Sequence, residues 1–386
     1  MKKCFLRDIA DIQTGPFGSQ LHKEDYVEVG TPIVTVEHLG NRIFTEQNLP
    51  KVSDADKARL KKYVLSEGDI VFSRVGSVDR CSFVDAEHDG WMFSGRCLRV
   101  RPHELIDPMY LYYFFCLSDT KQFVRNIAVG ATMPSINTKL LGEVEITFPE
   151  LPVQQRISHV LSLIDSKIEN NNRINENLQQ QAIALFINFY DRSDKEIGFT
   201  EIIQILGGGT PKTGEKTYWN GNIPFFTPKD VGSPYTLTTE KTITDTGLAH
   251  CNSRLYPVNT VFVTARGTVG KVSLAGVPMA MNQSCYALSG KAIPQLLTYF
   301  YTLKAVDRLK HKASGAVFDA IITRDFETEK VFELSREDAK TFLEIAEPMY
   351  QSILNNAIES QRLTALRTAL LPKLMSGEID LSDVQF

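Results

Sequence analysis

Residues 68–84 read GDIVFSRVGSVDRCSFV, and residues 259–275 read NTVFVTARGTVGKVSLA. Both stretches begin with a run of β-branched and aromatic residues that ends just before a glycine, and Gly76 matches Gly267 when the second stretch is shifted by 191 positions. Runs of this kind bounded by glycine are typical of β-strands followed by turns. The match therefore indicates that one strand-and-loop unit occurs twice in the chain.

Two further pairs of segments extend this match. The segment GTPIVTVEHL at 30–39 resembles NIPFFTPKDV at 222–231, and GATMPSINTKLL at 130–141 resembles GAVFDAIITRDF at 315–326. The last pair is offset by 185 positions instead of 191, so the offset drifts along the chain. Matches that recur in the same order at a drifting offset predict two copies of one architecture with loop insertions.

Each copy has a sheet-rich part followed by a long helix. The sheet-rich part consists of short β-branched and aromatic runs broken by Gly, Pro, Asn and Asp, which predicts twisted antiparallel sheet with long loops. Residues 108–126 and 295–312 predict amphipathic helices in matching places, with their aromatic side chains packed in a core. In the following TMPSINT stretch, Ser135 and Asn137 are expected to cap or turn the chain.

A seven-residue repeat of apolar residues in two segments predicts two long helices. Such a repeat is typical of a coiled coil. In the first helix the two repeat positions are occupied by Ile157, Ile164, Asn171, Leu178 and Leu185, and by Leu161, Ile168, Asn175, Ala182 and Phe189. In the second helix they are occupied by Phe342, Met349, Asn356, Leu363 and Leu370, and by Ala346, Ile353, Ser360, Arg367 and Leu374. Arg367 does not fit this apolar pattern.

Polar residues interrupt both apolar patterns near the middle of each helix. If the helices pair antiparallel about their midpoints, Asn171 faces Ser360 and Asn175 faces Asn356. Such polar layers would hydrogen-bond to each other and penalise slipped or parallel pairings. The alternative is that these residues simply face the solvent.

The predicted fold class is α+β, with two similar domains of twisted sheet plus helices, separated by two long helices that form an antiparallel coiled coil. The whole chain is expected to be an internal pseudo-two-fold repeat. The predicted ranges are a first domain at 1–150, a first helix at 151–192, a second domain at 193–333, and a second helix with a C-terminal tail at 334–386.

Composition limits the possible classes of function. The six cysteines include no Cys-x-x-Cys, the histidines lack metal-ligand spacing, and no run of about 18 apolar residues is present. We therefore expect a cytoplasmic protein with reduced thiols, no metal site and no membrane span. The net charge of −4 argues against a broadly basic nucleic-acid-binding surface. Residues 200–330 are nevertheless cationic, with 14 Lys+Arg against 10 Asp+Glu.

The segment GGGTPKTGEKTYWNGNIPFF, which starts at Gly207, nearly matches a phosphate-binding loop. In that loop Lys follows Gly directly and a helix begins there, because the helix N-terminus holds the phosphate. Here Glu215 separates Gly214 from Lys216, and the following Asn-Gly and Pro are turn formers and helix breakers. The sequence therefore argues against an ATP site.

Four segments resemble one family, the DNA-specificity subunits of type I restriction–modification systems. Residues 146–186, ITFPELPVQQRISHVLSLIDSKIENNNRINENLQQQAIALF, resemble the first spacer helix of that family, with Gln154-Gln155 where Glu-Gln is usual. The ending LRTALLPKLMSGEI at 366–379 resembles the end of the second spacer. GGGTPKTGEKTYWNGNIPFFTPKDV at 207–231 resembles the opening of a target recognition domain, and GDIVFSRVGSVDR its middle. The resemblance covers essentially the whole chain.

The resemblance implies how such a chain works. Each target recognition domain would grip one half-site of double-stranded DNA, and the helices would set a gap of non-specific sequence between the half-sites. In the family the spacers also dock two methyltransferase subunits, which bind S-adenosylmethionine and methylate adenine, and a motor-nuclease subunit completes the restriction complex. We therefore expect no catalytic residue and no cofactor in this chain, with S-adenosylmethionine, ATP and Mg in the partner subunits.

Candidate DNA-binding residues lie around the repeated loops, because Arg reads guanine, and Asn or Gln reads adenine, in the major groove. In the first domain the candidates are Ser73, Arg74, Gly76, Arg80 and Arg96, and in the second they are Lys212, Lys216, Thr264, Arg266, Gly267, Lys271, Asn282 and Gln283. Arg74 is the best candidate for reading a base. The alternative is that these arginines form surface ion pairs.

Other classes of function remain as alternatives. The chain could be the recognition subunit of a two-chain type II restriction system, a self-contained nuclease or nucleotide hydrolase, or a helical scaffold that does not touch DNA. No Asn-Pro-Pro-Tyr or Asp-Pro-Pro-Tyr motif, no dinucleotide-binding glycine pattern and no nuclease-like carboxylate cluster is found in the sequence.

Overall fold

The computed structural model describes residues 1–381 apart from 17, 19, 41, 233 and 313–319. Part of the sequence match at 315–326 therefore lies outside the described residues. The chain divides into two compact units. The first unit comprises Met1–Lys167 and the chain from Leu363 onward, and the second comprises Ile168–Arg362. Each unit therefore contains a sheet-rich domain and part of both long helices.

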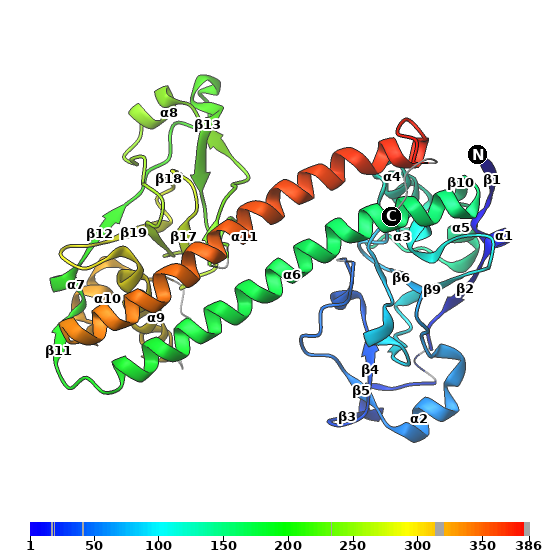
Figure 1. Cartoon of the computed structure of the whole chain (residues 1–386), viewed down its shortest axis with the longest axis horizontal. Helices are drawn as coiled ribbons and strands as arrows, with labels where there is room; N and C mark the ends of the chain where they lie inside the picture. The colour runs from blue at the N-terminus through cyan, green and yellow to red at the C-terminus, as the bar shows by residue number, and fades with distance from the viewer. Residues whose placement is uncertain (17, 19, 41, 233, 313–319, 382–386) are drawn as a thin grey trace. The chain divides into compact units, whose positions relative to one another are not determined.

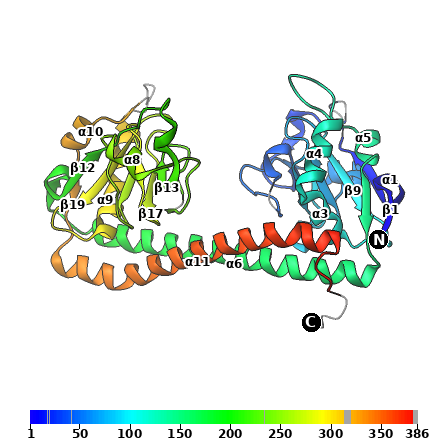
Figure 2. The same cartoon turned by 90° about the horizontal axis from the view of Figure 1, so that it is seen from above.

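The two long helices are α6 (Leu151–Tyr190) and α11 (Arg336–Ser376). In the first unit Leu161 of α6 shares a hydrophobic core with Leu371 of α11. In the second unit the rings of Phe186 and Phe342 lie 5.4 Å apart. Rising residue numbers in α6 thus meet falling numbers in α11, so the helices pack antiparallel within each unit (Figure 1 and Figure 2). None of the helices in the described ranges is long and apolar enough to span a membrane.

The first unit contains two sheets and a separate strand pair. One sheet has the order β2 (Ala10–Thr14), β9 (Cys97–Pro102), β6 (Ile70–Ser73) and β7 (Cys81–Phe83), and all its pairings are antiparallel. The other has the order β3 (Tyr26–Val27), β5 (Lys51–Val52), β4 (Thr31–Val34) and β8 (Met92–Phe93), with β4 and β8 parallel. Strands β1 (Lys2–Phe5) and β10 (Glu145–Phe148) pair separately.

The second unit repeats this topology. Its larger sheet has the order β12 (Ile203–Gly207), β19 (Cys285–Gly290), β16 (Val261–Thr264), β17 (Val272–Ala275) and β14 (Tyr235–Thr236). Its smaller sheet has the order β15 (Thr242–Ile243), β13 (Trp219–Phe226) and β18 (Ala280–Met281), with β13 and β18 parallel. Strands β11 (Glu196–Gly198) and β20 (Lys330–Phe332) pair as β1 and β10 do. The predicted internal repeat is thus present in the strand order of both units.

Helices cover the sheets in both units. Those of the first unit are α1 (Leu6–Ile9), α2 (Asp54–Arg59), α3 (Pro108–Cys116), α4 (Ser118–Ile127) and α5 (Thr138–Gly142). Those of the second unit are α7 (Phe199–Ile202), α8 (Asp245–Ala249), α9 (Gln295–Lys312) and α10 (Thr323–Thr328). Short 3₁₀ turns at 23–25, 36–38, 61–63, 86–88 and 216–218 complete the connections. The aromatic side chains of α3 and α9 are mostly buried, as predicted.

The prediction of a single helix over 108–126 was wrong. The chain breaks between α3 and α4 at Leu117, whose backbone is extended with ψ 138°. Ser118 and Asp119 follow, and such side chains compete with the helix for its backbone groups. The matching helix α9 runs unbroken through its corresponding turn. Asn137 caps α5 as expected, because its side-chain oxygen accepts a hydrogen bond from the Leu140 N–H at 2.9 Å.

Candidate nucleic-acid interface

The loop that follows β6 in the first unit is closed by its own backbone. The Ser73 N–H donates to the Arg80 carbonyl at 2.9 Å, and the Ser73 hydroxyl donates to the Val75 carbonyl at 2.7 Å. Gly76 stands at the tip with φ +75°, a conformation that favours glycine. Ser73 is buried, so its side chain supports the loop from inside.

The loop that follows β16 in the second unit is closed by the corresponding backbone bond. The Thr264 N–H donates to the Lys271 carbonyl at 3.0 Å, and the Lys271 N–H donates to the Thr264 hydroxyl at 2.9 Å. Gly267 has φ +82° and corresponds to Gly76. Thr264 is fully buried, like Ser73, and belongs to the frame of the loop.

Further backbone bonds tie each loop to its neighbours in the same way. In the first unit the Arg74 N–H donates to the Arg96 carbonyl at 2.8 Å, and the Ile136 N–H donates to the Arg74 carbonyl at 2.9 Å. The corresponding bonds of the second unit join Ala265 N–H to Ser284 O at 2.8 Å and Ile321 N–H to Ala265 O at 2.9 Å. Arg74 and Ala265 are 191 positions apart and Ile136 and Ile321 are 185 apart, as in the sequence match, while Arg96 and Ser284 are 188 apart.

The arginine side chains differ in how firmly they are held. Arg74 is half-buried and donates from Nη1 to the Gly95 carbonyl at 3.2 Å. Arg80 is exposed and its guanidinium lies against Gly40, where an added Cβ would come within 2.7 Å of Nε. Arg80, Arg96 and Arg266 are exposed and form no ion pair with any residue that the structure describes.

The Gly207 segment does not build a nucleotide site. A single 3₁₀ turn at Lys216–Tyr218 follows it and leads directly into β13. The Glu215 carboxylate accepts hydrogen bonds from the N–H and hydroxyl of Thr217, at 3.3 Å and 2.7 Å, where phosphate oxygens would have to lie. Lys212 and Lys216 are exposed on this segment.

The same segment lies beside the second loop. Gly208 passes so close to the Asn282 carbonyl that an added Cβ would stand 2.2 Å from its oxygen. The Thr210 hydroxyl donates to Gln283, and the Asn282 side chain accepts from the Ser284 N–H at 3.0 Å. The Ser284 carbonyl also accepts backbone hydrogen bonds from the loop that contains Arg266. Asn282, Gln283 and Arg266 therefore lie on adjoining backbone segments. Trp219 donates to the Lys212 carbonyl at 3.2 Å and supports the segment.

The polar residues of the helix pair meet within the second unit. The Asn171 side-chain amide donates to the Ser360 hydroxyl at 3.3 Å and to Glu359 at 2.8 Å. The Asn356 side-chain amide donates to the Asn175 side-chain oxygen at 2.9 Å. Asn171 is buried, so the alternative that these residues simply face the solvent does not describe this layer.

An ion pair in the helix pair of the first unit was missed by sequence reasoning. Arg367 donates to the buried carboxylate of Asp165 at 2.5 Å, and the Tyr113 hydroxyl of α3 donates to the same carboxylate at 2.7 Å. Burial and the Asp165 charge raise the pKa of Tyr113, which keeps its hydroxyl protonated as a donor. The apparent misfit of Arg367 in the apolar pattern was the available signal.

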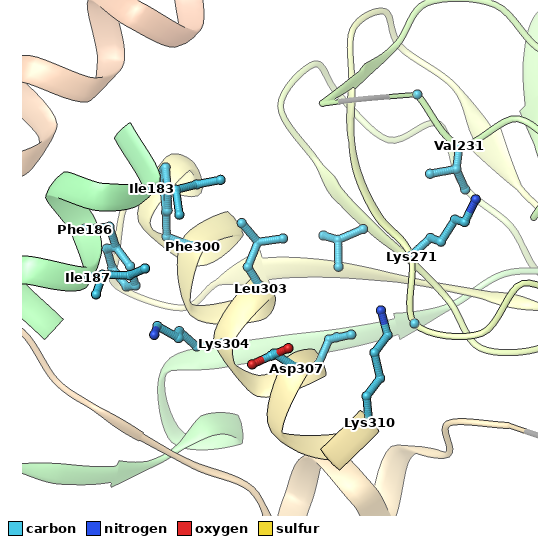
Figure 3. Close-up of a pocket in the computed structure, with 14 residues that line it drawn as sticks. Ile183, Phe186, Ile187, Val231, Lys271, Phe300, Leu303, Lys304, Asp307 and Lys310 are labelled. Atoms are coloured by element: carbon cyan, nitrogen blue, oxygen red, sulfur yellow. The ribbon is translucent and has the colours of Figure 1, made fainter. Parts of the chain in front are cut away.

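A cavity of about 570 Å³ lies in the second unit between α6, α9 and the loop that ends at Lys271. Phe186, Phe300 and Leu303 give it an apolar lining, and Figure 3 shows Lys304, Asp307 and Lys310 placed along α9. Lys271 also lines this cavity. In the described ranges no group of His, Cys, Asp and Glu side chains could hold a metal ion.

The paired loops, each at the end of a strand that pairs antiparallel with both of its neighbours, define a repeated architecture in the two units. The family model for the type I restriction modification DNA specificity domain matches residues 1–180 and 195–332. The chain therefore belongs to the type I restriction–modification DNA specificity subunits, which are DNA-recognising, non-catalytic components of restriction–modification complexes.

Relatives and a solved structure agree with this assignment. The MjaIX specificity subunit of Methanocaldococcus jannaschii is 23% identical over 73% of this chain and 72% of its own length. The HindI specificity subunit of Haemophilus influenzae is 22% identical over 82% of this chain and 88% of its own. The crystal structure of a type I S subunit from M. genitalium has a TM-score of 0.63, with 16% identity over 97% of this chain and 95% of that chain, and so shares the fold.

Proposed function

We propose that the chain reads a bipartite DNA target, with one half-site for each sheet-rich domain and a non-specific gap between the half-sites. The observation that carries the proposal is the pair of matched loops, Ser73–Arg80 and Thr264–Lys271, which share the backbone bond that closes them and differ in their side chains. Side chains at base edges specify sequence. Two different half-sites therefore require the same kind of loop backbone with different side chains.

The DNA-facing charges belong to these loops and their neighbours. Arg74, Arg80 and Arg96 serve the first half-site, with Arg74 reading a base. Arg266, Asn282 and Gln283 serve the second half-site, while Lys212, Lys216 and Lys271 hold phosphates. Phosphate contacts position the domains, so salt should weaken binding to all sequences alike.

The long helices would set the length of the gap and dock the partners. Hydrogen bonding between Asn171 and Ser360, and between Asn175 and Asn356, supports a single register, and a single register gives a single gap length. We propose that two methyltransferase subunits dock on this helix pair, bind S-adenosylmethionine and methylate adenine in the cytoplasm. A motor-nuclease subunit with ATP and Mg would complete a restriction complex.

Co-expression tests this proposal directly. The chain is expressed with its neighbouring methyltransferase in a host that lacks the modification, and modified adenines are mapped across the genome. A split motif, methylated on opposite strands in its two halves, is the expected result. A purified, assembled complex that modifies no split motif would refute the bipartite reading.

A further inference from the structure

The connection between α4 and α5 forms a small closed loop in the first unit. The Val129 N–H donates to the Ser135 carbonyl at 2.9 Å, and the Ser135 N–H donates back to the Val129 carbonyl at 2.8 Å. Gly130 has φ +108°, and a Cβ there would stand 2.7 Å from the Met133 carbonyl oxygen. The loop is therefore a tight turn that requires glycine at position 130.

This closed loop is fastened to the arginine loop of the candidate interface. The Gly76 N–H donates to the Pro134 carbonyl at 2.8 Å, and the Ile136 N–H donates to the Arg74 carbonyl at 2.9 Å. These two bonds flank the tip, so the backbone of one loop holds the backbone of the other. The closed loop therefore lies beside the backbone of Arg74 and Gly76.

The tip of the closed loop is apolar and exposed. Val129 is 63% exposed and Met133 is 66% exposed, although the first unit has a buried core available for such side chains. Residues 129–135 read VGATMPS and contain no charged side chain, so no carboxylate here would repel DNA phosphates. Exposed apolar side chains on a loop that bonds to the backbone of Arg74 and Gly76 point to a contact with an apolar part of DNA.

We propose that Met133, with Val129, contacts the C5 methyl group of a thymine in the half-site read by the first unit. This proposal rests on the proposed function, and it adds a specificity-determining contact that no hydrogen-bonding residue supplies. The thymine methyl is the apolar group that distinguishes one base edge in the major groove. A flexible, polarisable methionine side chain can adapt to it, while Arg74 on the bonded loop binds a polar base edge.

The experiment uses the complex of the chain with its methyltransferase on duplexes that carry the mapped target. Each thymine of both half-sites is replaced in turn by deoxyuridine, which lacks only the C5 methyl group, and binding affinity is measured. At one thymine the wild-type complex should lose about fivefold in affinity, the scale of one apolar contact. The variants Met133→Gln and Val129→Thr keep the side-chain size. Met133→Gln should bind thymine and deoxyuridine equally, whereas Val129→Thr keeps a methyl group and should lose only part of the preference.

Matched controls are available in the same unit. Leu105 is 64% exposed and Val29 is 87% exposed on other loops, so Leu105→Gln and Val29→Thr make the same kinds of change elsewhere. Both control variants should retain the fivefold preference for thymine. All four substitutions lie on exposed side chains and should leave the fold intact.

Each other outcome is decisive. Half-sites without thymine, no position sensitive to the methyl group, or an unchanged preference in Met133→Gln would overturn the proposal while the split motif stands. Weaker assembly with the methyltransferase, combined with no methyl sensitivity, would also overturn it and assign the tip to a protein contact. Failure of the assembled wild-type complex to recognise any split motif would instead refute the proposed function on which this contact rests.

Discussion

In the first unit the loop from Ser73 to Arg80 carries two arginines and one glycine, whereas the loop from Thr264 to Lys271 carries one arginine, one lysine and two glycines. Their backbones nevertheless share the closing bond from Ser73 to Arg80 and from Thr264 to Lys271, and Arg74 and Ala265 bond to matching neighbours. The comparison indicates that the hydrogen-bonded backbone of the loop and the side chains proposed to contact DNA bases can vary independently. Side chains in such a loop can change without altering the sheet beneath it.

The helix pair shows a similar contrast between the units. In the first unit its polar contact is a charged one, with Asp165 accepting from Arg367 and Tyr113. In the second unit the contact between Asn356 and Asn175 is made by uncharged amides, whereas Asn171 donates to the Ser360 hydroxyl and to Glu359. A buried charge loses more than an amide does when its partner is removed, so the two halves should respond unequally to mutation.

The largest effect is expected from Asp165→Ala. The Asp165 side chain is 4% exposed and that of Arg367 is 35% exposed, so the variant leaves a partly buried cation and the Tyr113 hydroxyl without their acceptor. We expect the free energy of unfolding to fall by about 3 kcal/mol. This is the low end of the range for a broken buried ion pair, because water reaches Arg367. Guanidinium unfolding would measure it.

The two tryptophans allow each unit to be followed by itself. Trp91 belongs to the first unit and Trp219 to the second, so Trp219→Phe and Trp91→Phe backgrounds report one unit each. Asp165→Ala should shift the Trp91 transition, and adding Arg367→Met should restore part of the loss. An unchanged Trp91 transition would show that the ion pair contributes nothing.

The next effect separates the reading side chains from the frame. Arg74→Ala should cost about 10- to 100-fold in discrimination at one position of one half-site, the usual value of a bidentate arginine–guanine contact. Arg266→Ala should do the same in the other half-site only. Methylation mapping of each variant complex measures both.

Arg59→Ala serves as the matched control for these variants. Arg59 is a surface arginine of the first unit that already pairs with Asp56, so its removal should leave the motif unchanged. Equal loss at both half-sites from Arg74→Ala would contradict the assignment of one half-site to each domain.

The backbone frame and the helix pairing were largely predictable from the sequence. The drifting offset located both loops, and the apolar repeat was sufficient to bring Asn171 opposite Ser360. Both signals are periodic or repeated, so they survive without knowledge of the tertiary structure. The strand order of the two sheets followed less directly, since short strands carry little pattern of their own.

The contacts that depend on one distant partner were not predictable. Tyr113 reaches Asp165 from a helix 52 positions earlier in the chain, and no periodicity connects them. The break at Leu117 was missed because no glycine or proline marks it. The exposure of Met133 was likewise hidden, because a methionine in a loop has no sequence signature of burial. Such features are determined by tertiary packing, which local patterns do not encode.

A smaller effect is expected from Asn175→Ala in the second unit. Asn175 accepts from the Asn356 amide at 2.9 Å and donates to the Ile353 carbonyl at 3.3 Å. Removing the Asn175 side chain should lower the free energy of unfolding by about 1 kcal/mol, which is the usual net value of a hydrogen bond between uncharged groups. The Trp219 transition would report the change, and Gln180→Ala on the exposed face of α6 is the control. A loss as large as that of Asp165→Ala would remove the contrast between charged and uncharged layers.

The last prediction concerns a pair of thiols that the repeat places alike. Cys97 begins β9 and Cys285 begins β19, and both are buried. Burial raises the pKa of each thiol to about 12, so the reactive thiolate is scarce in the folded protein at pH 8.5. Below the unfolded pKa of about 8.5 the thiol is neutral in both states and its contribution to stability is fully present, and that contribution is lost progressively as pH rises from about 8.5 to about 12. Iodoacetamide labelling at pH 8.5, read by mass spectrometry, should therefore leave both cysteines unmodified while the partly exposed Cys251 reacts. Rapid labelling of Cys285 alone would mean that the sheet of the second unit opens more readily than its counterpart, and the two frames would then differ in stability as well as in side chains.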